Sequence, residues 1–133
     1  MPDRRAIFES FAAAWNANDW KALEALHDRE TEIVAPEGWP EAGTFRGWPE
    51  VSRQYRRVKG SWTSERMEPG LMEPAGEAML TCTRWITRGE SSGAELEVDM
   101  WAVTEFRDER IRRIEYFLDE GAARAAAEHE ATP

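Results

Sequence analysis

Cysteine, histidine and positive charge are scarce in this sequence, and each scarcity argues against a class of function. The single cysteine, Cys82, rules out a disulfide within the chain, and its apolar neighbours favour a buried, unreactive thiol. Two histidines and one cysteine leave no spacing typical of a metal site. Because a glycine-rich phosphate loop is also lacking, we expect neither a metal nor an organic cofactor.

The charge balance and the lack of long apolar runs narrow the range of partners. Seventeen Lys and Arg stand against twenty-six Asp and Glu, which gives a formal charge of −9 at pH 7. This charge repels phosphates and anionic lipids, so we expect no nucleic acid and no membrane as a partner. No apolar run approaches the roughly 20 residues of a membrane-spanning helix, and the first residues lead into a helix rather than a signal sequence. The sequence therefore predicts a cytoplasmic protein.

The chain nevertheless contains enough apolar residues to form a core. Hydrophobic residues make up 41% of it, with seven Trp and five Phe, which is typical of a folded protein despite 32% charged residues. No linker or repeat divides the sequence. We therefore predict one domain over residues 1–133, with an ordered core over about residues 3–128.

Helical periodicity is confined to the first sixty residues and the C-terminal end. A first helix is expected over about residues 3–17, a second after the capping residues Asn18 or Asp19, and a third from Pro49. A short strand is expected at 31–35, between the second and third helices. Asp119 can cap a final, Ala-rich helix.

From residue 61 onward the pattern changes to a period of two, which is typical of β-strands. Strands are expected at about 62–73, 77–89, 94–107 and 110–118, with a bulge or an edge position at Pro69 and Gly70 and tight turns between them. Three helices followed by long hairpin-linked strands predict an α+β fold. We expect a cone-shaped, curved antiparallel sheet wrapped around the three helices, with a short C-terminal helix and a pocket at the open end of the cone.

Four segments, taken in order, resemble the SnoaL-like domain of the nuclear transport factor 2-like superfamily. They are residues 11–19 (FAAAWNAND), 43–51 (GTFRGWPEV), 88–93 (RGESSG) and 106–111 (FRDERI), the last leading to Tyr116. The sequence departs from the family pattern at Glu109, where such chains usually carry Gly in the last hairpin turn. If that turn needs a positive φ, Glu109 costs about 1 kcal/mol.

The resemblance implies a cone around a cavity, but it does not imply one activity. The superfamily includes cyclases, isomerases, epoxide hydrolases, dehydratases and non-catalytic binding modules. The positions that match the acid/base residues of ketosteroid isomerases look like Phe11, Ala35 and Thr104, so that chemistry is not expected. Of the epoxide-hydrolase residues, the resemblance offers Arg84 for the arginine, whereas Ile86 and Tyr116 stand where the two carboxylates would be.

Strand alternation and this resemblance together select the candidate site residues. The alternating apolar set of the strand at 94–107, which includes Met100 and Thr104, should face the helices. By analogy with the family, Arg84 and Tyr116 face inward with that set. An inward Arg84 could hold a ligand oxygen or form an internal ion pair with a carboxylate of the helices, and Tyr116 could donate a hydrogen bond to a ligand or to the backbone.

Other polar and aromatic residues are candidates with structural alternatives. Asp99 would be a carboxylate base only if a bulge turned its strand by one residue, because simple alternation puts it outside. His27, at the end of the second helix, is expected to serve as a cap or surface residue. Trp15, Trp39 and Tyr55 are expected to line or cover the pocket, with core packing as the alternative for Trp15.

The same alternation leaves three aromatic residues on the outer face of the sheet. Trp85, Trp101 and Phe117 would expose too much apolar surface there, so we expect a homodimer through this face. Three functions stay open at this point. They are binding of a small apolar, oxygen-bearing molecule with cofactor-independent cyclase or isomerase activity, a non-catalytic dimerisation or interaction module with a filled cone, and epoxide-hydrolase-like water activation by an inward Asp99 and Glu115.

Overall fold

The computed structural model describes residues 3–39, 41–89 and 94–132. Helices and strands follow in the order α1 (Arg4–Ala17), α2 (Trp20–Leu26), β1 (His27–Ala35), β2 (Gly43–Arg46), α3 (Trp48–Gly60), β3 (Ser64–Ala75), β4 (Ala78–Arg88), β5 (Glu95–Arg107), β6 (Arg110–Phe117) and α4 (Glu120–Ala131). The predicted elements are present within a few residues of their expected bounds. The short strand β2 was not predicted, because its four residues lie in a segment rich in Gly and Pro.

Local capping chemistry explains where the helices begin and end. The Asp3 carboxylate accepts a hydrogen bond from the Arg5 backbone N–H, and α1 ends at Asn18, whose φ of 55° lies in the left-handed region. Asp19 caps α2 by accepting from the Ala22 N–H at 3.1 Å. Asp119 caps α4 in the same way, with 2.8 Å to the Ala122 N–H. Both predicted caps are therefore confirmed.

The six strands form one curved, open sheet in the order β2-β1-β6-β5-β4-β3. Neighbouring strands are antiparallel except that β1 runs parallel to β6, so the sheet is mixed rather than purely antiparallel. The predicted irregularity in β3 is confirmed by a register shift between Pro69 and Met72. The tight turn between β5 and β6 holds Asp108 and Glu109 at φ of 52° and 62°, so the positive φ on which the predicted cost of Glu109 depended is present.

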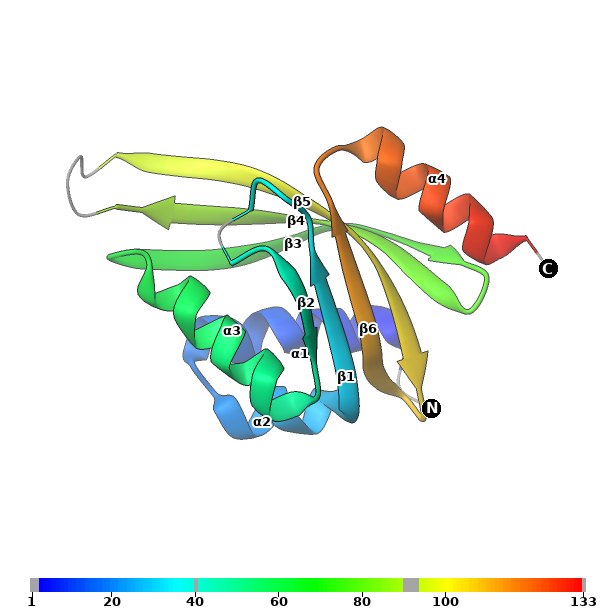
Figure 1. Ribbon diagram of the computed structural model, residues 1–133, viewed down its shortest axis with the longest axis horizontal. Helices are drawn as coiled ribbons and strands as arrows, with labels where there is room; N and C mark the ends of the chain where they lie inside the picture. The colour runs from blue at the N-terminus through cyan, green and yellow to red at the C-terminus, as the bar shows by residue number, and fades with distance from the viewer. Residues whose placement is uncertain (1–2, 40, 90–93, 133) are drawn as a thin grey trace.

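Both faces of the sheet are covered in part, by different helices. Figure 1 shows α1, α2 and α3 on one side of the curved sheet and α4 on the other. The larger cluster of buried residues joins α1 and α3 to the concave face and includes Phe11, Tyr55 and Met100. A smaller cluster joins α4 to the convex face through Ala123 and Ala127. The fold is thus the predicted α+β cone, with a second apolar layer on its outer side.

The free edge of β3 is held by a side chain of α1. Asn16 Nδ2 donates to the Met67 carbonyl at 2.9 Å, and the Met67 N–H donates to Asn16 Oδ1 at 2.8 Å. The amide of Asn16 therefore pairs with the strand as a neighbouring strand would. This contact connects the helical layer to the outermost strand of the sheet.

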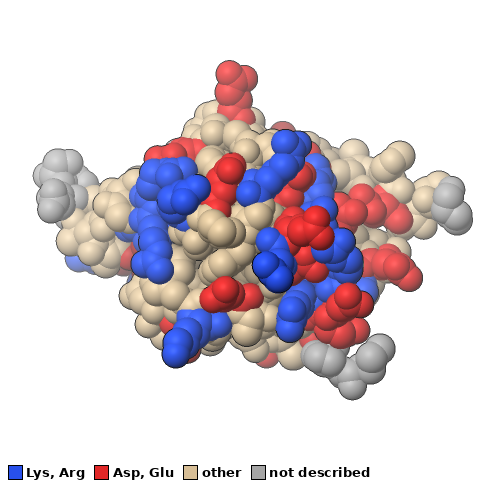
Figure 2. Space-filling view, turned by 60° about the horizontal axis from the view of Figure 1, so that its bottom comes forward, with Lys and Arg blue, Asp and Glu red and all other residues tan. Residues whose placement is uncertain are grey.

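Ion pairs connect the ends of the strands opposite the open end of the cone. Figure 2 shows Lys and Arg side chains interleaved with Asp and Glu over one half of this face. Arg107 donates two hydrogen bonds to the Asp28 carboxylate, at 2.6 and 3.0 Å, and these lower the pKa of that carboxyl. Arg113 pairs with Glu32 at 3.0 Å. None of the helices in the described part of the chain is long and apolar enough to cross a membrane.

Candidate functional site

A cavity of about 360 Å³ lies at the open end of the cone, and we call it the mouth pocket. It lies between the loop that follows β1, the segment that joins α3 to β3, and the ends of β4, β5 and β6. Its walls include Trp39, Trp62, Trp85, Leu96, Val98 and Asp99. Leu96 and Val98 remain solvent-exposed in the single chain, so the pocket has an apolar rim as well as an apolar floor.

Two tryptophans form a corner in the mouth pocket. The rings of Trp62 and Trp85 lie perpendicular, at 88°, with centroids 5.7 Å apart. Trp85 Nε1 donates to the Glu65 carboxylate at 2.9 Å. Trp62 Nε1 is buried and has no hydrogen-bond partner among the described residues. A buried donor without an acceptor is costly, and an acceptor brought by a ligand would satisfy it.

The position of Trp85 depends on a buried ion pair. Glu65 and Lys59 lie 2.7 Å apart, with side chains only 8% and 11% exposed. Besides Trp85, the Glu65 carboxylate accepts a hydrogen bond from the indole of Trp15, and Lys59 donates to the Trp15 carbonyl at 2.9 Å. Because every oxygen of Glu65 is engaged, this pair fixes the two indoles and is not free for acid/base chemistry.

Two smaller spaces continue from the mouth pocket into the cone. The middle chamber, of about 40 Å³, shares Trp39, Trp85 and Met100 with the mouth pocket and also borders Gln54 and Tyr55. The inner chamber, of about 30 Å³, lies deeper against α1 and shares Met100 and Tyr116 with the middle one. Each chamber can hold one or two waters, but neither can hold a substrate-sized molecule.

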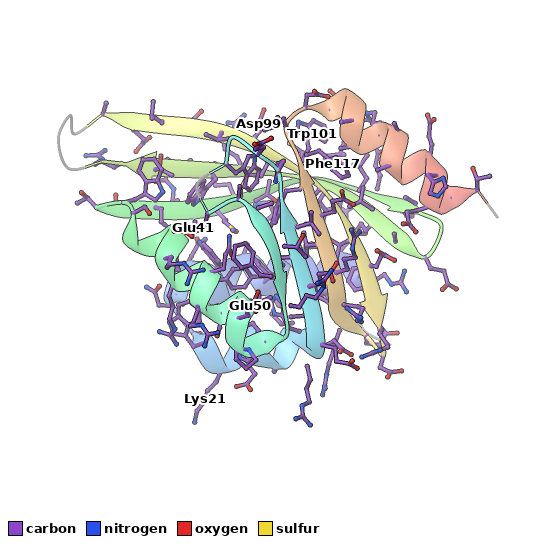
Figure 3. All side chains as sticks on the ribbon, viewed as in Figure 1. Lys21, Glu41, Glu50, Asp99, Trp101 and Phe117 are labelled. Atoms are coloured by element: carbon purple, nitrogen blue, oxygen red, sulfur yellow. The ribbon has the colours of Figure 1, made fainter. Side chains whose placement is uncertain are left out.

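Trp39 separates the mouth pocket from the deeper chambers. Its ring lies against that of Tyr116, with centroids 4.8 Å apart and planes tilted by 37°. The loop that carries it is tied to α3 by an ion pair of 3.1 Å between Glu41 and Arg57. Figure 3 labels Glu41 beside α3, at the entrance side of the cone. Trp39 borders both the mouth pocket and the middle chamber, so its indole lies between the mouth pocket and Tyr116.

The chambers are lined by neutral polar groups. Burial raises the pKa of the Tyr116 phenol, so its hydroxyl stays protonated and can only donate or accept a hydrogen bond. Thr104 borders the inner chamber, and its hydroxyl is buried without a hydrogen-bond partner among the described residues. Tyr116 and Thr104 thus lie inside the cone, as predicted, although their roles remain predictions.

His27 is not at the surface but in the floor of the cone. The residue is 3% exposed and is packed against Phe11, Trp48 and Tyr55. Its Nδ1 lies 2.6 Å from the Leu23 carbonyl, so Nδ1 carries the proton, and Nε2 accepts from the Tyr55 hydroxyl at 2.9 Å. Burial lowers the pKa of His27 to about 4, so the imidazole is neutral at pH 7. His27 is thus the C-cap residue of α2, which was one of its two expected roles, but it caps the helix from within the core and lines none of the three spaces.

The prediction that Arg84 faces the interior is wrong. Arg84 pairs with Asp99 across the strands, and its half-exposed side chain lies 3.7 Å from Asp99 and 3.8 Å from Glu97. Its ion-pair partners are therefore carboxylates of β5 rather than of a helix. The inward residue is Trp85, which pairs with Val98 on the concave face. Arg84 was placed inward only by analogy, and β4 carries apolar residues on both faces, so alternation could not correct the error.

Asp99 lies where simple alternation put it, on an exposed stretch of β5, but it also borders the mouth pocket. Its side chain is 58% exposed and lies on the outer face beside Arg84, so Asp99 borders the mouth pocket at the edge of the strand. Figure 3 shows it on β5 near Trp101 and Phe117. Glu115, its suggested partner in water activation, is paired with Arg113 at 3.1 Å and lines none of the three spaces. The inward pair of carboxylates is therefore not formed.

The prediction that three aromatic residues lie on the outer face of the sheet is right for two of them and wrong for Trp85. Trp85 is 6% exposed and belongs to the concave core, whereas Trp101 and Phe117 lie on the convex face as expected. Both are partly buried against the cluster that includes Ala123 and Ala127 of α4. The helix thus covers surface that a second subunit was expected to cover. The homodimer itself stays a prediction.

The predicted lining residues are brought together, and several others were missed. Trp39 and Met100 border the mouth pocket, and Trp15, Tyr55 and Met100 border the middle chamber. Sequence reasoning did not single out Leu96 and Val98, although both share the alternating set of Met100. No sequence signal marked Trp62, which follows the end of α3. Among the described residues, no cluster of three His, Cys, Asp or Glu could hold a metal ion.

A family model for the SnoaL-like domain matches residues 8–114, so the chain belongs to the SnoaL-like domain family. Among curated proteins, none matches the chain.

Solved structures show the same fold at low sequence identity. An NTF2-like protein of unknown function from Burkholderia pseudomallei is 18% identical, with a TM-score of 0.77 and 100% of both chains covered. TerC, co-crystallised with polyporic acid, is 18% identical, with a TM-score of 0.76. The match covers 94% of this chain and 98% of TerC. A ketosteroid isomerase-like protein from Catenulispora acidiphila, in complex with trimethylamine, is 17% identical, with a TM-score of 0.73 and 91% of both chains. The chain is therefore similar in fold to nuclear transport factor 2-like and ketosteroid isomerase-like proteins.

Proposed function

We propose that this protein binds a small, mostly apolar molecule that carries an oxygen atom, and that it does so in the mouth pocket. The observation that carries the proposal is the size and lining of that pocket. A volume of about 360 Å³ is within the range of small-molecule sites, and its walls are aromatic and aliphatic with few polar groups. The two deeper chambers are too small to compete for such a ligand.

The unpaired polar groups favour a ligand that accepts a hydrogen bond. The indole N–H of Trp62 has no acceptor within residues 3–39, 41–89 and 94–132, and the hydroxyl of Tyr116 lies behind the Trp39 ring. A carbonyl or hydroxyl oxygen would pair with either donor once the surrounding rings adjust. The similar structures that contain polyporic acid or trimethylamine support small-molecule binding by this fold.

If the protein is an enzyme, we expect cofactor-independent isomerisation or cyclisation by proton transfer. Asp99 would act as the base, because it is the carboxylate that borders the mouth pocket, and neutral Tyr116 would donate to the substrate oxygen. Arg84 shares the outer face with Asp99, 3.7 Å from its carboxylate, so in this scheme it would pair with the base and not with the substrate.

A non-catalytic interaction module is the second candidate. The observation in its favour is that the core of the cone is nearly filled, with only about 40 and 30 Å³ left behind Trp39. This candidate predicts that the mouth pocket takes no small molecule.

A matched pair of tryptophan substitutions separates the two candidates. Val98→Trp fills the mouth pocket, whereas Glu97→Trp adds the same bulk next to it on the strand, at a residue that does not border the pocket. A panel of aromatic and alicyclic alcohols and ketones is screened by ligand-observed NMR against the wild type and both variants. We expect binding to the wild type and to Glu97→Trp but not to Val98→Trp. Binding that Val98→Trp leaves intact, or no binding to any form, would overturn the proposal.

A further inference from the structure

The exposed apolar side chains of this protein lie together at the mouth pocket. In the part of the chain that the structure describes, three large hydrophobic side chains are exposed, Leu96, Val98 and Leu118, and all three border this pocket. Single apolar residues scattered over a surface need no explanation, whereas a group of them beside one cavity is typical of a binding site. The rim therefore extends the apolar surface of the pocket beyond its enclosed part.

Along β5, the concave face forms an apolar track that leads out of the cone. Met100, Val98 and Leu96 follow one another at every second residue, so they share this face of the strand. Their exposure rises outward, from 5% through 45% to 57%. The strand partners of the two outer residues, Trp85 opposite Val98 and Thr87 opposite Leu96, also border the mouth pocket. The track spans about 14 Å at the usual rise of a strand, and its outer half is open to solvent.

The concave walls offer no counter-charge to a ligand. Among the described residues that border the mouth pocket and the two chambers, none is Lys, Arg or His. Asp99 is the one carboxylate among them, and it lies on the outer face of β5 beside Arg84. An anionic or cationic group of a ligand would therefore lose its hydration on these walls without gaining a partner, which is costly. The lining is suited to an uncharged molecule.

Hydrogen-bond donors lie inside the cone, whereas the surface outside it is apolar. The N–H of Trp62 is buried without an acceptor among the described residues, and the neutral hydroxyl of Tyr116 lies behind Trp39. Val98 and Leu96, farther out, have no polar side-chain atom. A ligand that satisfies both regions points its oxygen inward and leaves its apolar part on the track.

We propose that the ligand of the mouth pocket is an elongated, uncharged molecule with an oxygen at one end and an unbranched apolar chain that leaves the pocket over Val98 and Leu96. The inference rests on the proposed function of the same pocket and adds the shape and charge of the ligand to it. A second copy of the chain is a weaker explanation of the rim, because three exposed side chains fall far short of the roughly 800 Å² per partner that a stable interface buries.

The test uses straight-chain ketones of increasing length, from 2-pentanone to 2-decanone, in isothermal titration calorimetry with the wild-type protein. Each added CH₂ should raise the affinity about fourfold where the chain is enclosed and about twofold where it lies half covered on the track, so the affinity should rise to the end of the series. The compact ketone 2-adamantanone has as many carbon atoms as 2-decanone and should bind more weakly. An affinity that stops rising at 2-hexanone, or tighter binding of 2-adamantanone, would overturn the proposal.

Two substitutions to serine locate the chain on the protein. Leu96→Ser removes the outer end of the track, so it should lower the affinity for 2-decanone about fivefold and leave that for 2-pentanone unchanged. Glu97→Ser is the matched control, because Glu97 is the next residue of the same strand but lies on the outer face and does not border the pocket. It should leave the dependence on chain length intact. Thermal melts of both variants check that the fold is kept.

The outcomes distinguish the inference from the function on which it rests. If the alcohols and ketones of the earlier panel bind but the straight-chain ketones do not, or if Leu96→Ser leaves the dependence on length unchanged, the elongated ligand alone is ruled out. If neither set binds, both proposals fail. Sedimentation velocity covers the remaining occupant of the rim. A dimer that Leu96→Ser dissociates and Glu97→Ser does not would make the rim a contact between two copies and overturn the inference.

Discussion

Both faces of this sheet carry large aromatic side chains, which line a cavity on the concave face and pack against a helix on the convex face. On the concave side, Trp62 and Trp85 line a cavity that is open at one end of the cone. On the convex side, Trp101 and Phe117 pack against the helix α4. Aromatic residues on a strand therefore do not by themselves mark a pocket or a subunit interface, because the element that covers them decides which of these forms.

The most drastic way to break this comparison is to lift α4 from the convex face. Ala123 is fully buried against the sheet, so Ala123→Glu would place a charge in an apolar contact. We expect a loss of about 5 kcal/mol in the free energy of unfolding, or detachment of the helix. Urea denaturation measures the loss.

Its control is Ala125→Glu, at an exposed position of the same helix, which should change stability by less than about 0.5 kcal/mol. Equal effects of the two substitutions would show that α4 contributes no specific packing.

On the concave side, we expect the largest loss of stability when the ion pair between Lys59 and Glu65, which holds the two tryptophans, is broken. Lys59→Met leaves the Glu65 carboxylate buried without its cation, and we expect a loss of about 3 kcal/mol. The double variant with Glu65→Gln should recover part of that loss, since glutamine can still accept from an indole. Urea unfolding of the single and double variants tests this, and additive losses would contradict the proposed coupling.

The floor of the cone should respond to pH through His27. Its folded-state pKa of about 4 lies below the usual 6.5, so the unfolded chain binds more protons between these values. Stability is fully present above pH 6.5 and falls as the pH drops toward 4, by about 2 kcal/mol at pH 5.

His27→Gln removes this titration and keeps a polar side chain. The loss between pH 7 and pH 5, measured by urea unfolding, should therefore be about 2 kcal/mol smaller in the variant than in the wild type. Parallel pH profiles for the two proteins would rule out His27 as the source.

The smallest change in stability is expected for substitutions of Thr104, which borders the inner chamber. Thr104 is fully buried, and its hydroxyl has no partner in the part of the chain that the structure describes, so Thr104→Val exchanges that hydroxyl for a methyl group of nearly the same shape. We expect no loss, or a gain of up to about 1 kcal/mol. Thr104→Ser keeps the hydroxyl, loses the methyl, and should destabilise by about 1 kcal/mol. The reverse order in thermal melts would mean that the hydroxyl has a partner, such as a water in the chamber.

The sequence predicted the fold well and the site only in part, for reasons that lie in β4. In β5, polar and apolar residues alternate, and the inward set of Met100, Ala102 and Thr104 is as expected. In β4, Met79 and Leu80 are both buried, because helices cover both faces of the sheet there. Alternation then carries no information about orientation, and the analogy that placed Arg84 inside was off by one residue.

The caps and turns were predictable because they depend on a few neighbouring residues. Asp19 and Asp119 cap their helices through their own side chains, and Asp108–Glu109 form the expected tight turn. The mouth pocket was foreseen only in part, because Trp39 was expected there but Trp62 reaches it from the segment between α3 and β3. Such positions are set by tertiary packing, which no local pattern records.

The amide of Asn16 has a consequence for how the protein behaves at high concentration. The outer edge of β3 would otherwise offer unpaired backbone groups to any other extended chain, the usual first step of aggregation through strand addition. Asn16 occupies both groups of Met67, and Pro69 and Pro74 lack an N–H to offer. One side chain from the first helix thus shields part of one of the two edges of the sheet from strand addition.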